Sequence, residues 1–269
     1  MHSEDVPVLD LAVAKKMQLP FVIGVGDNYF SEVKDILSST HFYNSIEDYC
    51  RERLSMSKTD YNRAYCAYFH INRMDSYFEK ADTDDAMNFF WGEGVCRRLF
   101  MKLNHENILE LACGRGRHVP EYIKYAKKIT LVDILEKNIQ ICRERFKQYN
   151  KIYYYCNNGK DLKGLPSDAY TSLFTYDAMV HFELMDIASY LQECYRVLRK
   201  GGIALFHHSN NCSDYKVDFS TGIHGRNYMS KDLFAHLSYR AGLEIVEQKI
   251  MDWGNVKELD CLTLVRKPE

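Results

Sequence analysis

The stretch Glu110-Leu-Ala-Cys-Gly-Arg-Gly-Arg-His118 decides the fold of this chain. It begins inside a short apolar run, residues 108–112, which is typical of a buried strand, and it precedes a segment that we expect to open a helix. At such a junction, free backbone amides can bind an anionic group of a ligand. Glycine is required at Gly114 and Gly116, because a side chain would hold the backbone away from the ligand or clash in the turn. The sequence therefore predicts a ligand-binding turn after the first strand of an α/β fold.

The spacing of these glycines argues against a dinucleotide ligand. A Gly-x-Gly-x-x-Gly loop would need a third glycine where this chain has Val119. Asp133 ends the next apolar run, where an acidic side chain can accept hydrogen bonds from both hydroxyls of a ribose. We therefore expect a nucleoside ligand that has no pyrophosphate.

Strand-like and helix-like patterns alternate after this turn, which predicts a doubly wound sheet of parallel strands. The remaining strand-like runs are residues 129–133, 152–155, 172–175 and 203–207. Lys200-Gly201-Gly202 is expected to close the helix before the last of these runs. Ser230 and Gly242 are expected to bound a final helix, and two strands follow it, at residues 243–251 and 261–265.

The N-terminal part of the chain has a different texture. From about residue 27 to 104, apolar residues recur at helical spacing among many charges, with hardly any Gly or Pro. We therefore divide the chain into a helical N-terminal cap, residues 1–104, and a ligand-binding domain, residues 105–269. Within the cap, residues 85–94 mix aromatic residues with Gly, which suits either part of a lid or an exposed loop packed on the core.

The glycine loop resembles motif I of class I S-adenosylmethionine-dependent methyltransferases, in which an acidic residue precedes the glycines, as Glu110 does here. The resemblance implies a Rossmann-like, seven-stranded α/β sheet whose last strand is antiparallel. It also implies S-adenosylmethionine as the cofactor. Glu110 would then face the methionyl amino group, the loop and Arg117 would face the carboxylate, and Asp133 matches the family's motif II.

Further cofactor contacts follow from the same resemblance. Cys156-Asn-Asn-Gly159 resembles the adenine-contacting loop, which assigns the adenine to Asn158, although many relatives carry Asp there. The complete set of expected cofactor-binding residues is Glu110, Ala112, Gly114, Gly116, Arg117, Asp133, Asn158 and Tyr176.

Histidines follow both the fourth and the fifth strand. A hydroxyl acceptor benefits from a base that takes its proton during methyl transfer, and histidine is the obvious residue type. Strand alternation turns His207 and His208 to opposite sides, and we favour His181 and His208 as the catalytic candidates. The plain alternative is that these histidines are satisfied polar groups lining a loop. We expect acceptor contacts from Asp177, His207, Arg226 and Asn227.

From Trp91 to Lys267, the chain looks like bacterial methyltransferases found with sugar- and polysaccharide-modifying pathways, most clearly at residues 177–183 and 205–210. This resemblance implies O-methylation of a sugar hydroxyl or another small polar metabolite. Two alternatives stay open: N-, S- or carboxyl-methylation of another metabolite, and a non-catalytic scaffold that binds S-adenosylmethionine.

The composition restricts the partners. Lys and Arg total 35 and Asp and Glu total 37, so no overall field attracts nucleic acid or anionic lipid. The nine cysteines form no CxxC pair, and neither a signal peptide nor a long apolar segment is apparent. We expect a cytoplasmic protein that uses no metal and acts on a small-molecule acceptor, without nucleic acid or membrane as partner. A homodimer is left open.

Overall fold

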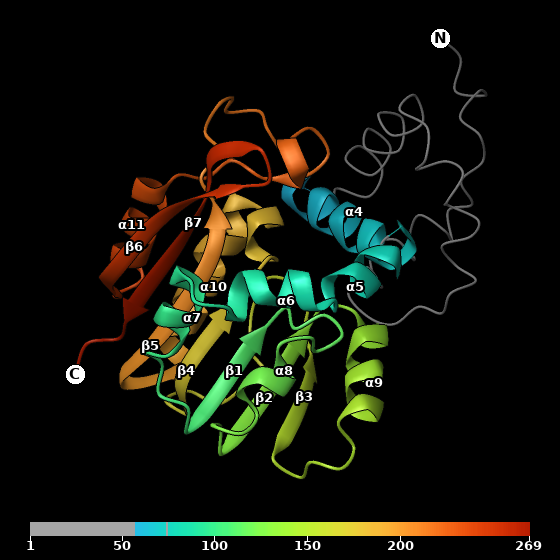
Figure 1. Ribbon diagram of the computed structural model, residues 1–269. Helices are drawn as coiled ribbons and strands as arrows, with labels where there is room; N and C mark the ends of the chain where they lie inside the picture. The colour runs from blue at the N-terminus through green and yellow to red at the C-terminus, as the bar shows by residue number, and fades with distance from the viewer. Residues whose placement is uncertain (1–56, 74) are drawn as a thin grey trace.

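Seven strands form one sheet in the computed structural model, which describes residues 57–73 and 75–269 (Figure 1). The order across the sheet is β3-β2-β1-β4-β5-β7-β6. The strands are β1 (Asn107–Leu111), β2 (Lys128–Asp133), β3 (Ile152–Cys156), β4 (Tyr170–Thr175), β5 (Leu198–Ser209), β6 (Glu244–Trp253) and β7 (Val256–Arg266).

Strands β1 to β5 are parallel, and β7 runs antiparallel between β5 and β6. This arrangement confirms the expected Rossmann-like doubly wound sheet with an antiparallel last strand. The chain order reverses between β1 and β4, which are neighbours in the sheet. Ligands of open α/β sheets bind at such a reversal, beyond the carboxyl ends of the strands.

Helices cover both faces of the sheet (Figure 1). Alternation along β4 shows the two layers, because Leu173 belongs to one buried cluster and Phe174 to the other. The cluster around Phe174 takes side chains from α6 (Asp84–Trp91), α7 (Val95–Phe100), α8 (Val119–Tyr122) and α9 (Glu136–Arg145). The cluster around Leu173 takes side chains from α10 (Leu184–Val197) and α11 (Lys231–Arg240).

The predicted end of α10 was wrong. The helix ends at Val197, and Gly201 and Gly202 lie inside β5 instead of closing the helix. Gly201 has a φ of +71°, at a place where the pairing of β4 with β5 is irregular. Its backbone N–H donates to the carbonyl of Lys267 at 2.9 Å, so the glycine serves an irregularity of the sheet. The predicted cap of α11 is confirmed, because Ser230 Oγ accepts from the Leu233 N–H at 3.1 Å.

The described part of the N-terminal region is helical, with α4 (Lys58–Arg73) and α5 (Asp75–Ala81) before α6 and α7. Residues 1–56 of the expected cap lie outside the described residues, and the boundary at residue 104 stays a prediction. Residues 84–91 form helix α6, whose Phe90 is buried against Trp91 and Phe100. Across residues 57–73 and 75–269, no helix has the length and apolar character needed to span a bilayer.

Candidate functional site

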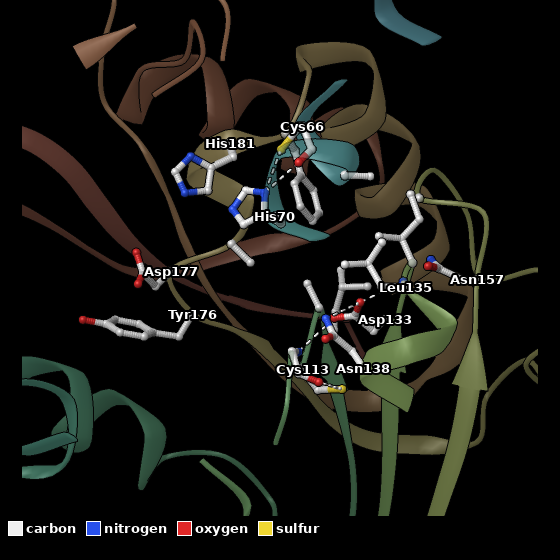
Figure 2. A pocket seen from close by; sticks show the side chains of 18 of the residues that line it. Cys66, His70, Cys113, Asp133, Leu135, Asn138, Asn157, Tyr176, Asp177 and His181 are labelled. Carbon is white, nitrogen blue, oxygen red and sulfur yellow. Dashed lines mark hydrogen bonds between the residues drawn. The ribbon is translucent and has the colours of Figure 1, made fainter. Parts of the chain in front are cut away.

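A cavity lies where the chain order of the sheet reverses, beyond the carboxyl ends of the parallel strands. Its walls come from α4 and α5, from the segments after β1, β2, β3 and β4, and from α10. The empty volume is about 1100 Å³ with the open mouth included. In Figure 2, Cys113, Asp133 and Asn138 mark one end, here named the loop end. His70, Tyr176, Asp177 and His181 mark the other, the histidine end.

The turn after β1 forms the loop end, and three of its residues have positive φ: Ala112 at 56°, Gly114 at 55° and Gly116 at 75°. A Cβ atom on Gly116 would lie 2.5 Å from Cε2 of Phe146, which packs below the turn. The requirement for glycine at this position was therefore anticipated, and contact with the underlying core enforces it. Ala112 adopts the same left-handed backbone in spite of its side chain, which stores strain in the wall of the cavity.

Asp133 joins the tips of β1 and β2. Its carboxylate accepts hydrogen bonds from the Gly114 N–H at 2.9 Å, the Leu135 N–H at 2.9 Å and the Asn138 amide at 3.1 Å. Burial raises the pKa of Asp133 to about 6, although all three donors oppose the rise. The carboxylate lies in the cavity wall, where the sequence placed it.

Glu110, Gly116 and Asn158 do not line the cavity. The Tyr122 hydroxyl donates to Glu110 at 2.7 Å below the turn, and burial raises the pKa of Glu110 to about 8. Asn158 closes its own turn, because its side-chain oxygen accepts from the Asp161 N–H at 2.9 Å. The neighbouring Asn157 lines the cavity instead, with its amide donating to the Tyr190 hydroxyl at 2.7 Å.

Arg117 and Asp177 form an ion pair across the cavity wall, with Arg117 Nη2 donating to Asp177 Oδ2 at 3.1 Å. Asp177 is the second residue beyond β4 and has a φ of +53°. Its backbone N–H donates to Nδ1 of His207 at 3.0 Å. Tyr176, also in the wall, stacks on the ring of His207 with centroids 4.6 Å apart.

His181, one of the two catalytic candidates from the sequence, lines the histidine end of the cavity. Its Nδ1–H donates to the carbonyl of Gly225 at 2.9 Å, which leaves the lone pair on Nε2. Burial, a neighbouring histidine (His70) and Arg226 lower the pKa of His181 to about 3, while Asp177 acts in the opposite direction. The imidazole is therefore neutral at neutral pH and can accept a hydrogen bond.

His208 lies outside the cavity, in contrast to the expectation that it faces the acceptor. Its ring stacks on Phe234 with centroids 3.9 Å apart and planes at 4°. Nδ1–H donates to the carbonyl of Ser209 at 2.8 Å, and Nε2 accepts from the Thr263 hydroxyl at 2.8 Å. Both ring nitrogens are thus satisfied inside the core, and His208 does not remain a candidate base.

His207, Arg226 and Asn227 are buried behind the histidine end instead of lining it. Arg226 makes a bidentate ion pair with Asp260 on β7, at 3.0 and 2.6 Å, and His207 Nε2–H donates to the same carboxylate at 3.0 Å. Asn227 donates to the carbonyl of His181 at 2.7 Å. These three residues therefore position Asp177 and His181 from behind.

Helix α4 supplies cavity residues that the sequence analysis missed: Arg63, Cys66, Ala67 and His70. Their spacing puts them on one face of the helix. The sequence showed this face but did not show which part of the protein it contacts. The partner is α10, because Arg63 makes a bidentate ion pair with Asp186 at 2.8 and 2.6 Å.

Among residues 57–73 and 75–269, no cluster of three His, Cys, Asp or Glu could hold a metal ion.

The chain is similar in sequence to known methyltransferases. Residues 109–206, which contain the turn, Asp133 and Asp177, match the family model described as a methyltransferase domain. The chain is 23% identical over 211 residues to a demethylmenaquinone methyltransferase of Tropheryma whipplei, covering 74% of this chain and 77% of that one. It is 27% identical over 177 residues to a probable S-adenosylmethionine-dependent methyltransferase of Mycolicibacterium smegmatis, covering 63% and 64% of the two chains.

Solved structures share the fold. A protein of Pyrococcus horikoshii superposes with a TM-score of 0.55 at 19% identity, covering 72% of this chain and 99% of that one. An S-adenosylmethionine-dependent methyltransferase of Mesorhizobium loti superposes with a TM-score of 0.53 at 16% identity, covering 65% and 98%. At these identities the similarity establishes the fold alone.

Proposed function

We propose that this chain, an S-adenosylmethionine-dependent methyltransferase, methylates a hydroxyl group of a small polar acceptor, with sugars as the acceptor class. The observation that carries the proposal is the position of His181. It is a neutral imidazole in the cavity wall whose Nδ1–H is fixed on Gly225, so that Nε2 is left to accept a proton.

The loop end suits S-adenosylmethionine, the cofactor. The left-handed residues Ala112, Gly114 and Gly116 make a turn with little side-chain bulk, which suits the methionyl part of the molecule. Asp133 has one acceptor position left after its three protein donors, and this position suits a ribose hydroxyl. Asn157 and Leu135 stand beyond Asp133 in the wall and suit the adenine.

The histidine end suits a hydroxyl acceptor. When bound, the cofactor supplies a sulfonium methyl that is already activated, so the protein must hold the acceptor oxygen in line and take its proton. His181 accepts the proton at Nε2, and the carboxylate of Asp177 stabilises the imidazolium that forms, since its charge opposes the burial that lowers the pKa of His181. Arg117 and His207 hold Asp177 in place.

Labelled methyl transfer tests this proposal. The full chain is incubated with S-adenosylmethionine carrying a labelled methyl group and with separate panels of sugars, amines, thiols, carboxylates and a demethylmenaquinone. The last is included because the T. whipplei relative is named for it. We expect label on a hydroxyl oxygen, with at least a hundredfold loss of kcat in His181→Phe. Label on nitrogen, sulfur, carbon or a carboxylate would overturn O-methylation. Calorimetry that detects no binding of S-adenosylmethionine would remove the cofactor assignment as well.

A further inference from the structure

Two imidazole rings stand together at the histidine end of the cavity. His70 from α4 and His181 after β4 have ring centroids 5.4 Å apart, and Figure 2 shows them on the same side of the cavity as Asp177. Both residues line the cavity. The segments that carry them are far apart in the sequence, so the pair exists only because α4 lies against the carboxyl ends of the strands.

Both rings are fixed in the same tautomer. The Nδ1–H of His70 donates to the carbonyl of Cys66 at 2.7 Å, as that of His181 does to Gly225 at 2.9 Å. Each ring therefore has its lone pair on Nε2. Within the described part of the chain, neither Nε2 atom has a hydrogen-bond partner, and both residues belong to the cavity wall. The cavity thus presents two hydrogen-bond acceptors side by side.

Burial keeps both rings neutral, so that both act as hydrogen-bond acceptors. Burial lowers the pKa of His70 and of His181, and the negative charge of Asp177 opposes the shift at both. The neighbouring cations are committed elsewhere, because Arg226 pairs with Asp260 and Arg117 pairs with Asp177. An anionic acceptor would therefore meet two lone pairs and a carboxylate, whereas hydroxyl groups can donate to both Nε2 atoms.

Building on the O-methylation proposed above, we propose that the histidine end binds a pair of neighbouring hydroxyl groups. One hydroxyl donates to Nε2 of His181 and is the group to be methylated. The second donates to Nε2 of His70 and fixes the position of the first. His70 is accordingly a binding residue that sets acceptor specificity, and a compound with one hydroxyl occupies only half of the site.

Binding of hydroxyl compounds to the complex with S-adenosylhomocysteine, which has no methyl group to transfer, tests the paired-hydroxyl site separately from methyl transfer. The full chain is saturated with S-adenosylhomocysteine, and cis-1,2-cyclohexanediol, trans-1,2-cyclohexanediol and cyclohexanol are titrated against it by NMR. We expect one of the diols to bind at least about fivefold more tightly than cyclohexanol, the gain of one neutral hydrogen bond. In protein with ¹⁵N-labelled histidine, the Nε2 resonances of both His70 and His181 should move with that diol, and only one of them with cyclohexanol.

Substitutions at His70 give the second arm. His70→Phe keeps a ring beside Phe69 and Phe219 but has no lone pair, so the preference for the diol should fall to about onefold. His70→Gln places an amide oxygen near the position of Nε2 and should keep most of the preference. His236→Phe, on the exposed side of α11, is the matched control and should behave as the wild type.

The outcomes separate the two proposals. Equal affinity for diol and cyclohexanol, no binding of either, or a preference that survives His70→Phe would overturn the paired-hydroxyl site. A diol preference that depends on His70, in a protein that methylates no hydroxyl compound, would leave the binding site standing and remove the O-methylation.

Discussion

His207 and Asp177 are joined by a hydrogen bond from the Asp177 backbone N–H to Nδ1 of His207, at 3.0 Å. The contact fixes a backbone that has a φ of +53°, a conformation that costs a non-glycine residue free energy. On its other side, His207 donates to Asp260 at 3.0 Å. Strand β5 therefore holds the carboxylate of the histidine end through a side chain that does not itself line the cavity.

Replacing His207 should reduce turnover without changing cofactor affinity. We expect His207→Phe, which keeps the ring stacked on Tyr176, to lower kcat at least about tenfold and the free energy of unfolding by about 1–3 kcal/mol. The dissociation constant of S-adenosylhomocysteine, measured by calorimetry, should change less than about twofold. His207→Asn can still accept from the Asp177 N–H and should recover part of kcat. Equal kcat in the wild type and His207→Phe would show that the contact has no role in positioning.

Two substitutions in the turn after β1, Gly116→Ala and Ala112→Gly, should differ in their effect on stability and cofactor binding. Gly116→Ala places a Cβ 2.5 Å from Phe146 at a φ of +75°, so it should lose at least about 2 kcal/mol of stability and weaken cofactor binding more than about tenfold. Ala112→Gly relieves a positive φ but gains chain entropy on unfolding, so its stability should stay within about 1 kcal/mol of the wild type. Urea denaturation and calorimetry measure both quantities. A tolerant Gly116→Ala would contradict the packing seen below the loop.

The ion pair of Arg63 should hold α4 against α10. Arg63→Gln leaves the buried carboxylate of Asp186 without its bidentate partner, which should cost about 2–3 kcal/mol. Arg98→Gln is the control, since Arg98 makes a comparable bidentate pair with Glu247 but is 47% exposed, so water screens the pair and its loss should cost much less stability than the loss of the Arg63 pair. Chemical denaturation compares the two. Similar losses would mean that the Arg63 pair is no stronger than a surface ion pair.

His208 should make the fold sensitive to acid. Burial lowers the pKa of His208 from 6.5 to about 3, so between pH 6.5 and 3 this side chain binds a proton in the unfolded chain but not in the folded chain. Stability from this group is complete above pH 6.5 and is lost as the pH falls towards 3. The difference in unfolding free energy between the wild type and His208→Gln should therefore shrink by about 1–2 kcal/mol from pH 7 to pH 5. Because other buried histidines are present in both proteins, a constant difference would refute the assignment to His208.

The succession of strands and helices along the chain could be predicted because it rests on local patterns. Apolar runs such as residues 129–133 and helical faces such as that of Ile139 and Cys142 specify their own element, and connection rules then favour a doubly wound parallel sheet. The antiparallel last strand was expected from the family resemblance. Gly201 was misplaced, because a glycine pair suits a helix end and a sheet irregularity equally well. Only the pairing of Gly201 with Lys267, across the sheet, decides between them.

The site was predicted in part, for a related reason. Alternation showed that His207 and His208 point to opposite sides, but the side of the acceptor depends on β7, whose Asp260 binds His207. Likewise, nothing local distinguishes Asn157 from Asn158. His70 was missed because its place in the cavity depends on contacts such as the one from Arg63 to Asp186, which lies 123 residues away in the sequence.

The face of α4 that carries Cys66, Ala67 and His70 allows the histidine end of the cavity to be redesigned. These side chains belong to a helix outside the sheet, whereas the turn after β1 and Asp133 are built into it. A library of variants confined to these helix positions would vary the shape and polarity of the acceptor site, while the loop end that suits the cofactor stays constant. New acceptors could thus be selected with the same methyl donor throughout.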